Sequence, residues 1–96
     1  MTILNDENLD SFDFKGIANE LCSLISRFIY EKRRLKKISR EKLATITGVD
    51  RKSIYNIEFN KSSYTFKNCI TLVYALGYKM IDVMNYINEK RVKAYA

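Results

Sequence analysis

The sequence has no histidine, and this absence limits the chemistry open to the chain. Histidine is the commonest general base and the commonest metal ligand near neutral pH. The two cysteines are far apart and the carboxylates are scattered, so no metal-ligand spacing is present either. We therefore expect no enzymatic activity, no metal site and no other cofactor.

Proline is also absent, and only three glycines occur. Proline breaks a helix interior and glycine weakens it, so long helices can run here without interruption and the connections must be short. A chain of 96 residues with 47% hydrophobic content can bury one small core. The composition predicts an all-α chain with a single domain.

Cysteine is scarce and long apolar runs are missing. Cys22 and Cys69 each lie in an apolar helical pattern, which predicts reduced, buried thiols and no disulfide framework. No apolar run approaches the roughly 20 residues needed to cross a bilayer. Residues 1–13 are acidic, the opposite of a signal peptide. We expect a cytoplasmic protein that does not enter a membrane.

The net charge of +6 is unevenly distributed. The first thirteen residues carry four carboxylates and no base, so the remaining 83 residues carry +10. Between Arg27 and Lys52, ten lysine or arginine side chains face only three acidic ones. Most charge runs are solvated helix faces, but an excess of this size favours a polyanionic partner.

Residues 39–58 read S-R-E-K-L-A-T-I-T-G-V-D-R-K-S-I-Y-N-I-E, the pattern of two short amphipathic helices joined by a glycine turn. Ser39 and Asp50 are suited to cap the two helices. Gly48 can adopt the positive φ that ends the first of them. The expected helices span 40–47 and 51–59.

The second of these helices has two different faces. Ile54 and Ile57 fall three residues apart and share the buried face. The outer face carries Arg51, Lys52, Tyr55 and Asn56. Such a helix pair, with basic residues opening its second helix, is the arrangement that places a helix in the major groove of DNA. The alternative is that Arg51 and Lys52 are ordinary solvated charges with no role in binding. Cations at a helix start oppose the helix dipole, however, so stability alone does not favour them there.

Apolar periodicity predicts three further helices. The first begins near Asp10, Ser11 or Asp13 and ends near Lys37. Its apolar stripe consists of Phe14, Ile17, Ala18, Leu21, Leu24, Ile25, Phe28 and Ile29. A helix capped by Thr65 and closed by Gly77 follows the pair, and the last helix carries Met80, Val83, Met84 and Ile87. The expected domain organisation is a flexible acidic tail at 1–10, one helix-turn-helix domain at 11–88, and a basic tail at 89–96 that frays.

Several motifs occur together at a recognisable spacing. Arg33 is followed by S-R-E-K-L-A at 39–44, by G-V-D-R-K-S-I-Y-N-I-E at 48–58, and by A-L-G-Y at 75–78. In this combination the segment 28–87 resembles the DNA-binding domain of the Cro and phage-repressor family, the Xre-type helix-turn-helix proteins. The resemblance implies a five-helix, lambda-repressor-like domain. It also implies a sequence-specific regulator of transcription, a repressor, encoded by a bacterium or phage and acting on double-stranded DNA.

The resemblance assigns roles to the outer face of the second helix of the pair. Arg51, Lys52 and Asn56 match the positions that reach base edges. Arginine and lysine donate to guanine, and asparagine pairs with adenine. The expected backbone contacts come from Arg40, Lys61 and Lys67, while Ser53 or Tyr55 adds a phosphate or thymine contact.

The resemblance also implies a structural ion pair between Arg33 and Glu58, which would fix the recognition helix against the first helix. Two positions depart from the family pattern. Phe59 replaces a polar residue that contacts phosphate, and Asn60 replaces a glycine. We expect Phe59 either to pack under the following loop or to present an aromatic ring to a partner.

The apolar stripe of the first helix starts about ten residues before the family's usual first helix. Exposed apolar surface of this kind marks an interface. The predicted interface residues, for a homodimer or a protein partner, are Phe12, Phe14, Ile17, Leu21, Tyr86 and Ile87. The segment folding back over its own core is the alternative.

A second functional hypothesis follows, in which the chain is an antitoxin or accessory protein of a mobile element and DNA binding is secondary. RNA binding is a third, for which an aromatic platform is lacking.

Overall fold

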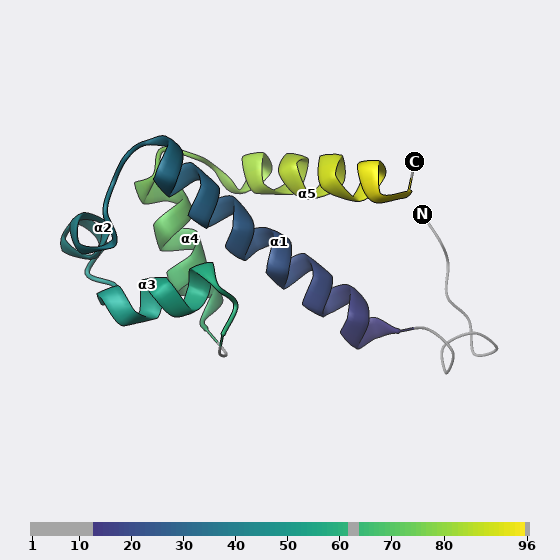
Figure 1. The fold of residues 1–96 in the computed structure, drawn as a ribbon, viewed down its shortest axis with the longest axis horizontal. Coiled ribbons are helices and arrows are strands. Elements are labelled where there is room, and N and C mark those ends of the chain that lie inside the picture. Colours follow the sequence, from purple (N-terminus) through teal and green to yellow (C-terminus); the bar gives the residue numbers. More distant parts are fainter. Residues whose placement is uncertain (1–12, 62–63, 96) are drawn as a thin grey trace.

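The computed structural model describes residues 13–61 and 64–95, with side chains as far as Arg91. In this part of the chain the secondary structure is entirely helical (Figure 1). The helices are α1 (Phe14–Leu35), α2 (Arg40–Thr47), α3 (Arg51–Glu58), α4 (Phe66–Ala75) and α5 (Met80–Tyr95). The predicted all-α, five-helix class is confirmed. None of the described helices is both long and apolar enough to cross a membrane.

Short polar side chains start the first four helices, as the sequence predicts. Each of them accepts a hydrogen bond from a backbone N–H three residues later, which satisfies one of the donors that a helix start leaves open. The caps are Asp13, Ser39, Asp50 and Thr65. Asp13 therefore decides between the three predicted starts of α1. Gly48 ends α2 at φ 78°, and its N–H donates to the Ala44 carbonyl at 2.8 Å.

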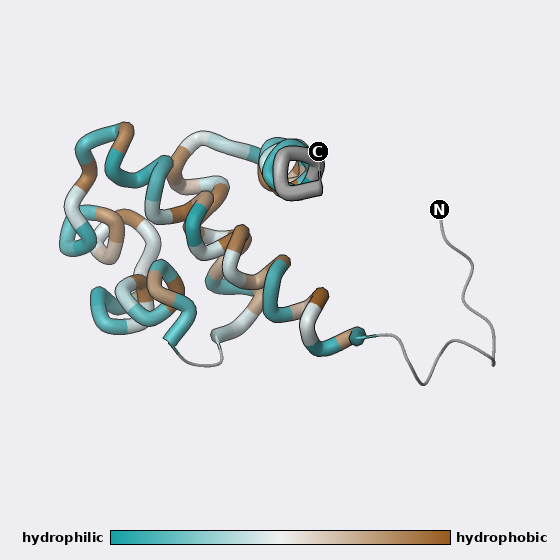
Figure 2. The backbone as a smooth tube through the Cα atoms, turned by 45° about the vertical axis from the view of Figure 1, so that its right-hand side comes forward, coloured by the Kyte–Doolittle hydropathy of each residue, from teal (hydrophilic) through white to brown (hydrophobic). Residues whose placement is uncertain are grey.

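The core lies where α1 packs against α3, α4 and α5, and α2 packs against α3 and α4. Its helical stripe supplies Phe28 and Ile29, which are fully buried. Along the tube in Figure 2, apolar segments of α1 alternate with hydrophilic ones, as expected for a helix with one buried face. The other buried apolar residues are Leu43, Val49, Ile54, Ile57, Cys69, Leu72, Val73, Leu76, Val83 and Ile87.

The prediction that residues 89–96 form a frayed tail is wrong, because α5 continues to Tyr95. The segment after Ile87 contains no glycine or proline and is rich in good helix formers. An ion pair also links this part of α5 to α1, with Arg91 Nε 3.3 Å from Glu20 Oε1. The basic residues expected in a tail are therefore part of a helix.

Tyr86 and Ile87 were expected at an interface, and for Ile87 this assignment is wrong, while Tyr86 is partly exposed. Ile87 belongs to the buried core. Tyr86 packs edge-on against Phe28, with 5.3 Å between ring centroids, and its hydroxyl donates to Glu31 Oε2 at 3.0 Å. Both residues are used inside the chain because α5 packs along α1.

Burial, together with the hydrogen bond to the Glu31 carboxylate, raises the pKa of Tyr86 to about 12. The folded chain therefore holds this proton more tightly than the unfolded chain, whose tyrosine has a pKa near 10.0. The resulting stabilisation is complete below pH 10 and disappears as the pH rises through about 12. We expect Tyr86→Phe to lose less stability between these pH values than the wild type. Urea denaturation across this range measures the difference, and identical losses in the two proteins would contradict the assignment.

The early turns of α1 extend beyond the packed helices (Figure 1). Leu21 is partly buried against the core, Ile17 is partly exposed, and Phe14 is 50% exposed. Phe12 lies outside the described residues. Cys22 was expected to be buried but is exposed, because it lies one turn before the buried Ser26, where α1 leaves the core. Cys69 is buried as predicted, and burial raises the pKa of its thiol to about 11.

Candidate nucleic-acid interface

The outer face of α3 presents polar and basic side chains over a fully buried inner face. Ile54 and Ile57 have no exposed surface and anchor the helix to the core. Arg51 and Lys52 are exposed in the first turn, and Asn56 follows one turn later, partly exposed. Lys52 and Asn56 lie four residues apart and share one side of α3, and Arg51 is exposed beside Lys52.

The turn between α2 and α3 is held by side-chain hydrogen bonds. Thr47 Oγ1 donates to the Leu43 carbonyl at 2.8 Å and accepts from the Val49 N–H at 3.1 Å. Asp50 accepts from the Ser53 hydroxyl at 2.7 Å and from the Ser53 N–H at 3.0 Å. These bonds lower the pKa of Asp50. In this structure the Ser53 hydroxyl donates to the cap, and its contact with DNA stays a prediction.

Arg51 is paired with an acid from the neighbouring helix. Its Nε lies 2.9 Å from Glu41 Oε1, and both side chains are exposed. An exposed ion pair contributes at most about 1 kcal/mol. Glu41 therefore orients Arg51 over α2 but does not prevent it from turning toward another partner.

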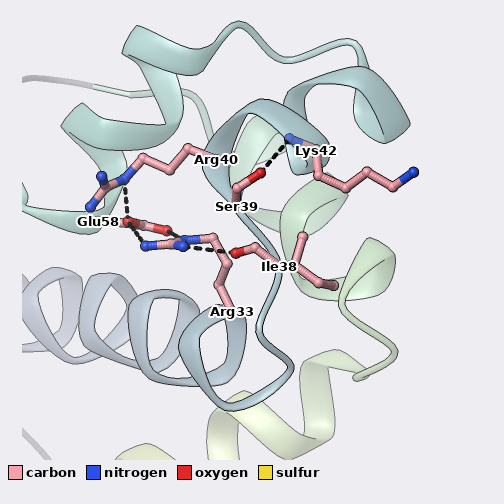
Figure 3. A network of polar contacts seen from close by, with 6 residues as sticks. All are labelled: Arg33, Ile38, Ser39, Arg40, Lys42 and Glu58. Carbon is pink, nitrogen blue, oxygen red and sulfur yellow. Dashed lines mark hydrogen bonds and ion pairs between the residues drawn. The ribbon is translucent and has the colours of Figure 1, made fainter.

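Arg33 and Glu58 form the buried ion pair that the resemblance implies (Figure 3). The Glu58 side chain has no exposed surface, and that of Arg33 is 7% exposed. Arg33 donates from Nε to Glu58 Oε2 at 2.5 Å and from Nη2 to Oε1 at 3.1 Å. Its Nη1 donates to the Ile38 carbonyl at 2.8 Å. One guanidinium thus joins α1 to the end of α3 and to the segment leading into α2.

Arg40 also binds Glu58, so two arginines share one carboxylate (Figure 3). Its Nε donates to Glu58 Oε1 at 2.8 Å, and its side chain is 24% exposed. The guanidinium carbon lies 5.2 Å from the ring centroid of Tyr55 and 5.5 Å from that of Phe59. The Arg40 guanidinium is therefore held in one position, from which the expected contact with a phosphate would have to be made. The cluster keeps a net positive charge.

Phe59 lies in an aromatic cluster at the end of α3, and it remains exposed. Its ring is 4.8 Å from Tyr55 and 5.7 Å from Tyr30 of α1, measured between centroids. Asn60, which stands where the family pattern has glycine, follows with the left-handed φ of 51°, and its side-chain amide donates to Ser23 Oγ at 3.3 Å. Phe59 therefore braces α3 against α1 and also presents part of its ring to solvent.

The two predicted lysine contacts flank α3 on different sides. Lys61 Nζ lies 5.2 Å above the Tyr55 ring, after the end of α3. Lys67 is exposed in the first turn of α4, beside a groove of about 310 Å³ that also borders the α2–α3 turn. Basic side chains thus occur on both sides of the outer face of α3.

Comparison with known proteins assigns a family to this arrangement. A family model described as helix-turn-helix matches residues 29–83, more than half of the chain. The chain belongs to this helix-turn-helix family. No curated protein sequence matches it.

A solved helix-turn-helix structure is also similar to the chain. It is the crystal structure of the restriction-modification controller protein C.Esp1396I as a tetramer in complex with its natural 35 base-pair operator. The TM-score is 0.65 and the sequence identity 26%, over 72% of this chain and 91% of that chain. The helix-turn-helix match begins at Ile29, so most of α1 precedes it.

Three contacts of this helix-turn-helix site were not predicted. Arg40 binds Glu58 at the end of α3. Glu41 orients Arg51 across two helices, and Tyr30 of α1 contacts the end of α3. None of these partners lies at a helical spacing from the residue it contacts, so no local pattern identifies it. The approach of Tyr55 and Phe59, four residues apart, is the part of the aromatic cluster that the helical period could have predicted.

Proposed function

We propose that this sequence-specific DNA-binding regulator of transcription inserts α3 into the major groove and represses a promoter by occupying it. The accessible basic face of α3, held by buried residues on its other side, carries this proposal. Arg51 and Lys52 would donate to guanine and Asn56 would pair with adenine. The similar controller protein was crystallised on its operator, which supports the same mode of action. We place this action in a bacterial cytoplasm, with a bacterial or phage gene as its source.

The proposed backbone contacts surround α3. Arg40 offers a fixed positive group before it, Lys61 lies near its end, and Lys67 lies beside its start. Such contacts position a protein on the duplex without reading its sequence. They make binding depend on salt, because each neutralised phosphate releases counterions.

Selection of bound fragments from genomic DNA, followed by salt titration of the preferred fragment, tests the proposal. We expect a preferred fragment whose log K falls by about 0.9 per phosphate contact for each decade of salt. If no fragment were bound above the non-specific background, sequence-specific regulation by this chain would be rejected.

We further propose that the protein acts as a homodimer. The exposed apolar side chains Ile81 and Met84 lie three residues apart on α5, which places them on one face of this helix. Tyr74 of α4 is also exposed, and its hydroxyl oxygen accepts a hydrogen bond from the Met80 N–H at 3.4 Å. A symmetric dimer would set two copies of α3 about 34 Å apart, one turn of DNA. The tetrameric state of the similar controller protein supports self-association.

The double substitution Ile81→Glu/Met84→Glu is expected to convert the dimer to a monomer, because it would bury like charges in the interface. Light scattering measures the mass of each variant. Phe14→Glu, in the exposed early part of α1, is the matched control and is expected to leave the mass unchanged. The opposite pattern would move the interface to α1, the position expected from the sequence.

A protein partner on the early part of α1 is the second candidate function, as for an antitoxin or accessory protein. The observation that favours it is the exposed Phe14, in a segment that precedes the family match. Co-purification from the native host distinguishes the two functions, since only this one requires a stoichiometric partner that Phe14→Glu releases.

A further inference from the structure

An open groove runs between the start of α2 and the outer face of α3. Its volume is about 310 Å³, and it is lined by Arg40, Arg51, Lys52 and Tyr55. Arg51 and Tyr55 lie four residues apart, so the groove follows one face of α3. This is the face proposed above to enter the major groove, and the inference rests on that proposed function.

The charges around the groove are less favourable to an anion than the number of cations indicates. Arg40 already donates to Glu58, and Arg51 is paired with Glu41. Lys52 takes part in no ion pair among the described residues. Arg51 is thus compensated at short range and Arg40 only in part, because Glu58 is shared with Arg33. The groove keeps a positive charge, but less than its three cations would supply on their own.

The remaining wall of the groove is an aromatic ring held from two sides. Phe59 lies 4.8 Å from the Tyr55 ring, measured between centroids, and the Arg40 guanidinium lies 5.2 Å from it. Arg40 is itself held by Glu58, whose side chain is fully buried. Tyr55 is 38% exposed, so part of its ring is accessible while its position is restrained.

A restrained aromatic wall between cations suits an apolar group on a polar, anionic ligand. In the major groove that group is the C5-methyl of thymine, and C5 is also where cytosine is methylated. We propose that this groove binds the C5-methyl edge of one pyrimidine in each DNA site, with Tyr55 as the contacting wall. Arg40 and Phe59 act as positioning residues for the Tyr55 ring. From the sequence, Tyr55 could contact either a phosphate or a thymine. The geometry of the groove favours the C5-methyl group of a pyrimidine.

Changing one methyl group on the DNA tests the proposal. In the fragment preferred by the wild-type protein, each thymine is replaced in turn by deoxyuridine, and each cytosine in turn by 5-methylcytosine. Burial of one methyl group predicts an effect of about fourfold on binding. If the pyrimidine in the groove is a thymine, loss of its methyl is expected to weaken binding by this factor. If it is a cytosine, addition of a methyl is expected to tighten binding by the same factor. Which of the two occurs identifies the pyrimidine.

Two variants show whether the methyl effect passes through Tyr55. In Tyr55→Phe, which keeps the ring, the effect is expected to persist, and in Tyr55→Ala it is expected to vanish at that position alone. Thermal melting confirms that both variants fold. If no pyrimidine shows a methyl effect, or if the effect persists in Tyr55→Ala, the groove is not a methyl site. Failure to obtain a preferred fragment at all would instead reject the proposed function.

Discussion

Replacing Glu58 with alanine is expected to lower the free energy of unfolding by about 3 to 5 kcal/mol. The Glu58 side chain is fully buried and accepts hydrogen bonds from Arg33 and Arg40. Its removal leaves the Arg33 guanidinium, 7% exposed, as a buried charge without its carboxylate. Burying an uncompensated charge costs far more than the intact pair contributes. Urea denaturation followed by circular dichroism measures the change.

Arg40→Ala is the matched control for this substitution. It removes the more exposed of the two arginines and leaves the pair between Arg33 and Glu58 intact. We expect it to cost clearly less stability than Glu58→Ala, because it leaves no buried charge unpaired. If Glu58→Ala melted like the wild type while DNA binding was lost, the carboxylate would have a role in binding and not in the architecture.

This network connects the scaffold to the recognition helix. Arg33 belongs to α1, Glu58 ends α3, and the Ile38 carbonyl precedes α2, so one guanidinium fixes three segments relative to each other. An ion pair of this kind adds little net stability, but its hydrogen-bond geometry admits few alternative arrangements. The orientation of α3 is therefore set by side chains that lie behind its exposed outer face.

Local signals in the sequence predicted the helix boundaries well. A cap needs only a short polar side chain next to a helix start, and a left-handed turn needs only a residue that tolerates positive φ. Ser39, Gly48 and Asp50 provide these signals within a few residues of the backbone groups they satisfy. The ion pair between Arg33 and Glu58, 25 positions apart, was implied only by the family resemblance.

Contacts between distant segments were the part that the sequence did not predict. Tyr86 and Ile87 were assigned to an interface because nothing local shows that α5 packs along α1. The continuation of α5 was missed although residues after Ile87 are good helix formers, and its ion pair between Arg91 and Glu20 is a contact between distant segments. Within the site, the partners of Arg40 and Arg51 lie on neighbouring helices. Their approach depends on helix crossing and not on sequence spacing.

Arg51→Ala is expected to weaken binding to the preferred DNA fragment by about 5- to 150-fold, the loss for one base-edge contact worth about 1 to 3 kcal/mol. Arg51 is exposed at the start of α3, and its pair with Glu41 is an exposed one that DNA can replace at little cost. Its loss should relax the preference at one base pair and leave binding to unrelated DNA nearly unchanged. Competition assays with fragments mutated at single positions measure this.

Lys67→Ala is the control that distinguishes base-specific contacts from non-specific contacts with the DNA backbone. Lys67 lies beside the start of α3 on α4, and its proposed contact is a phosphate. Its removal should weaken binding to all sequences alike and reduce the salt slope by about 1. If Arg51→Ala also weakened preferred and unrelated DNA equally, Arg51 would be a backbone contact. Base reading would then have to come from Lys52 and Asn56, the other polar residues predicted to read bases from the outer face of α3.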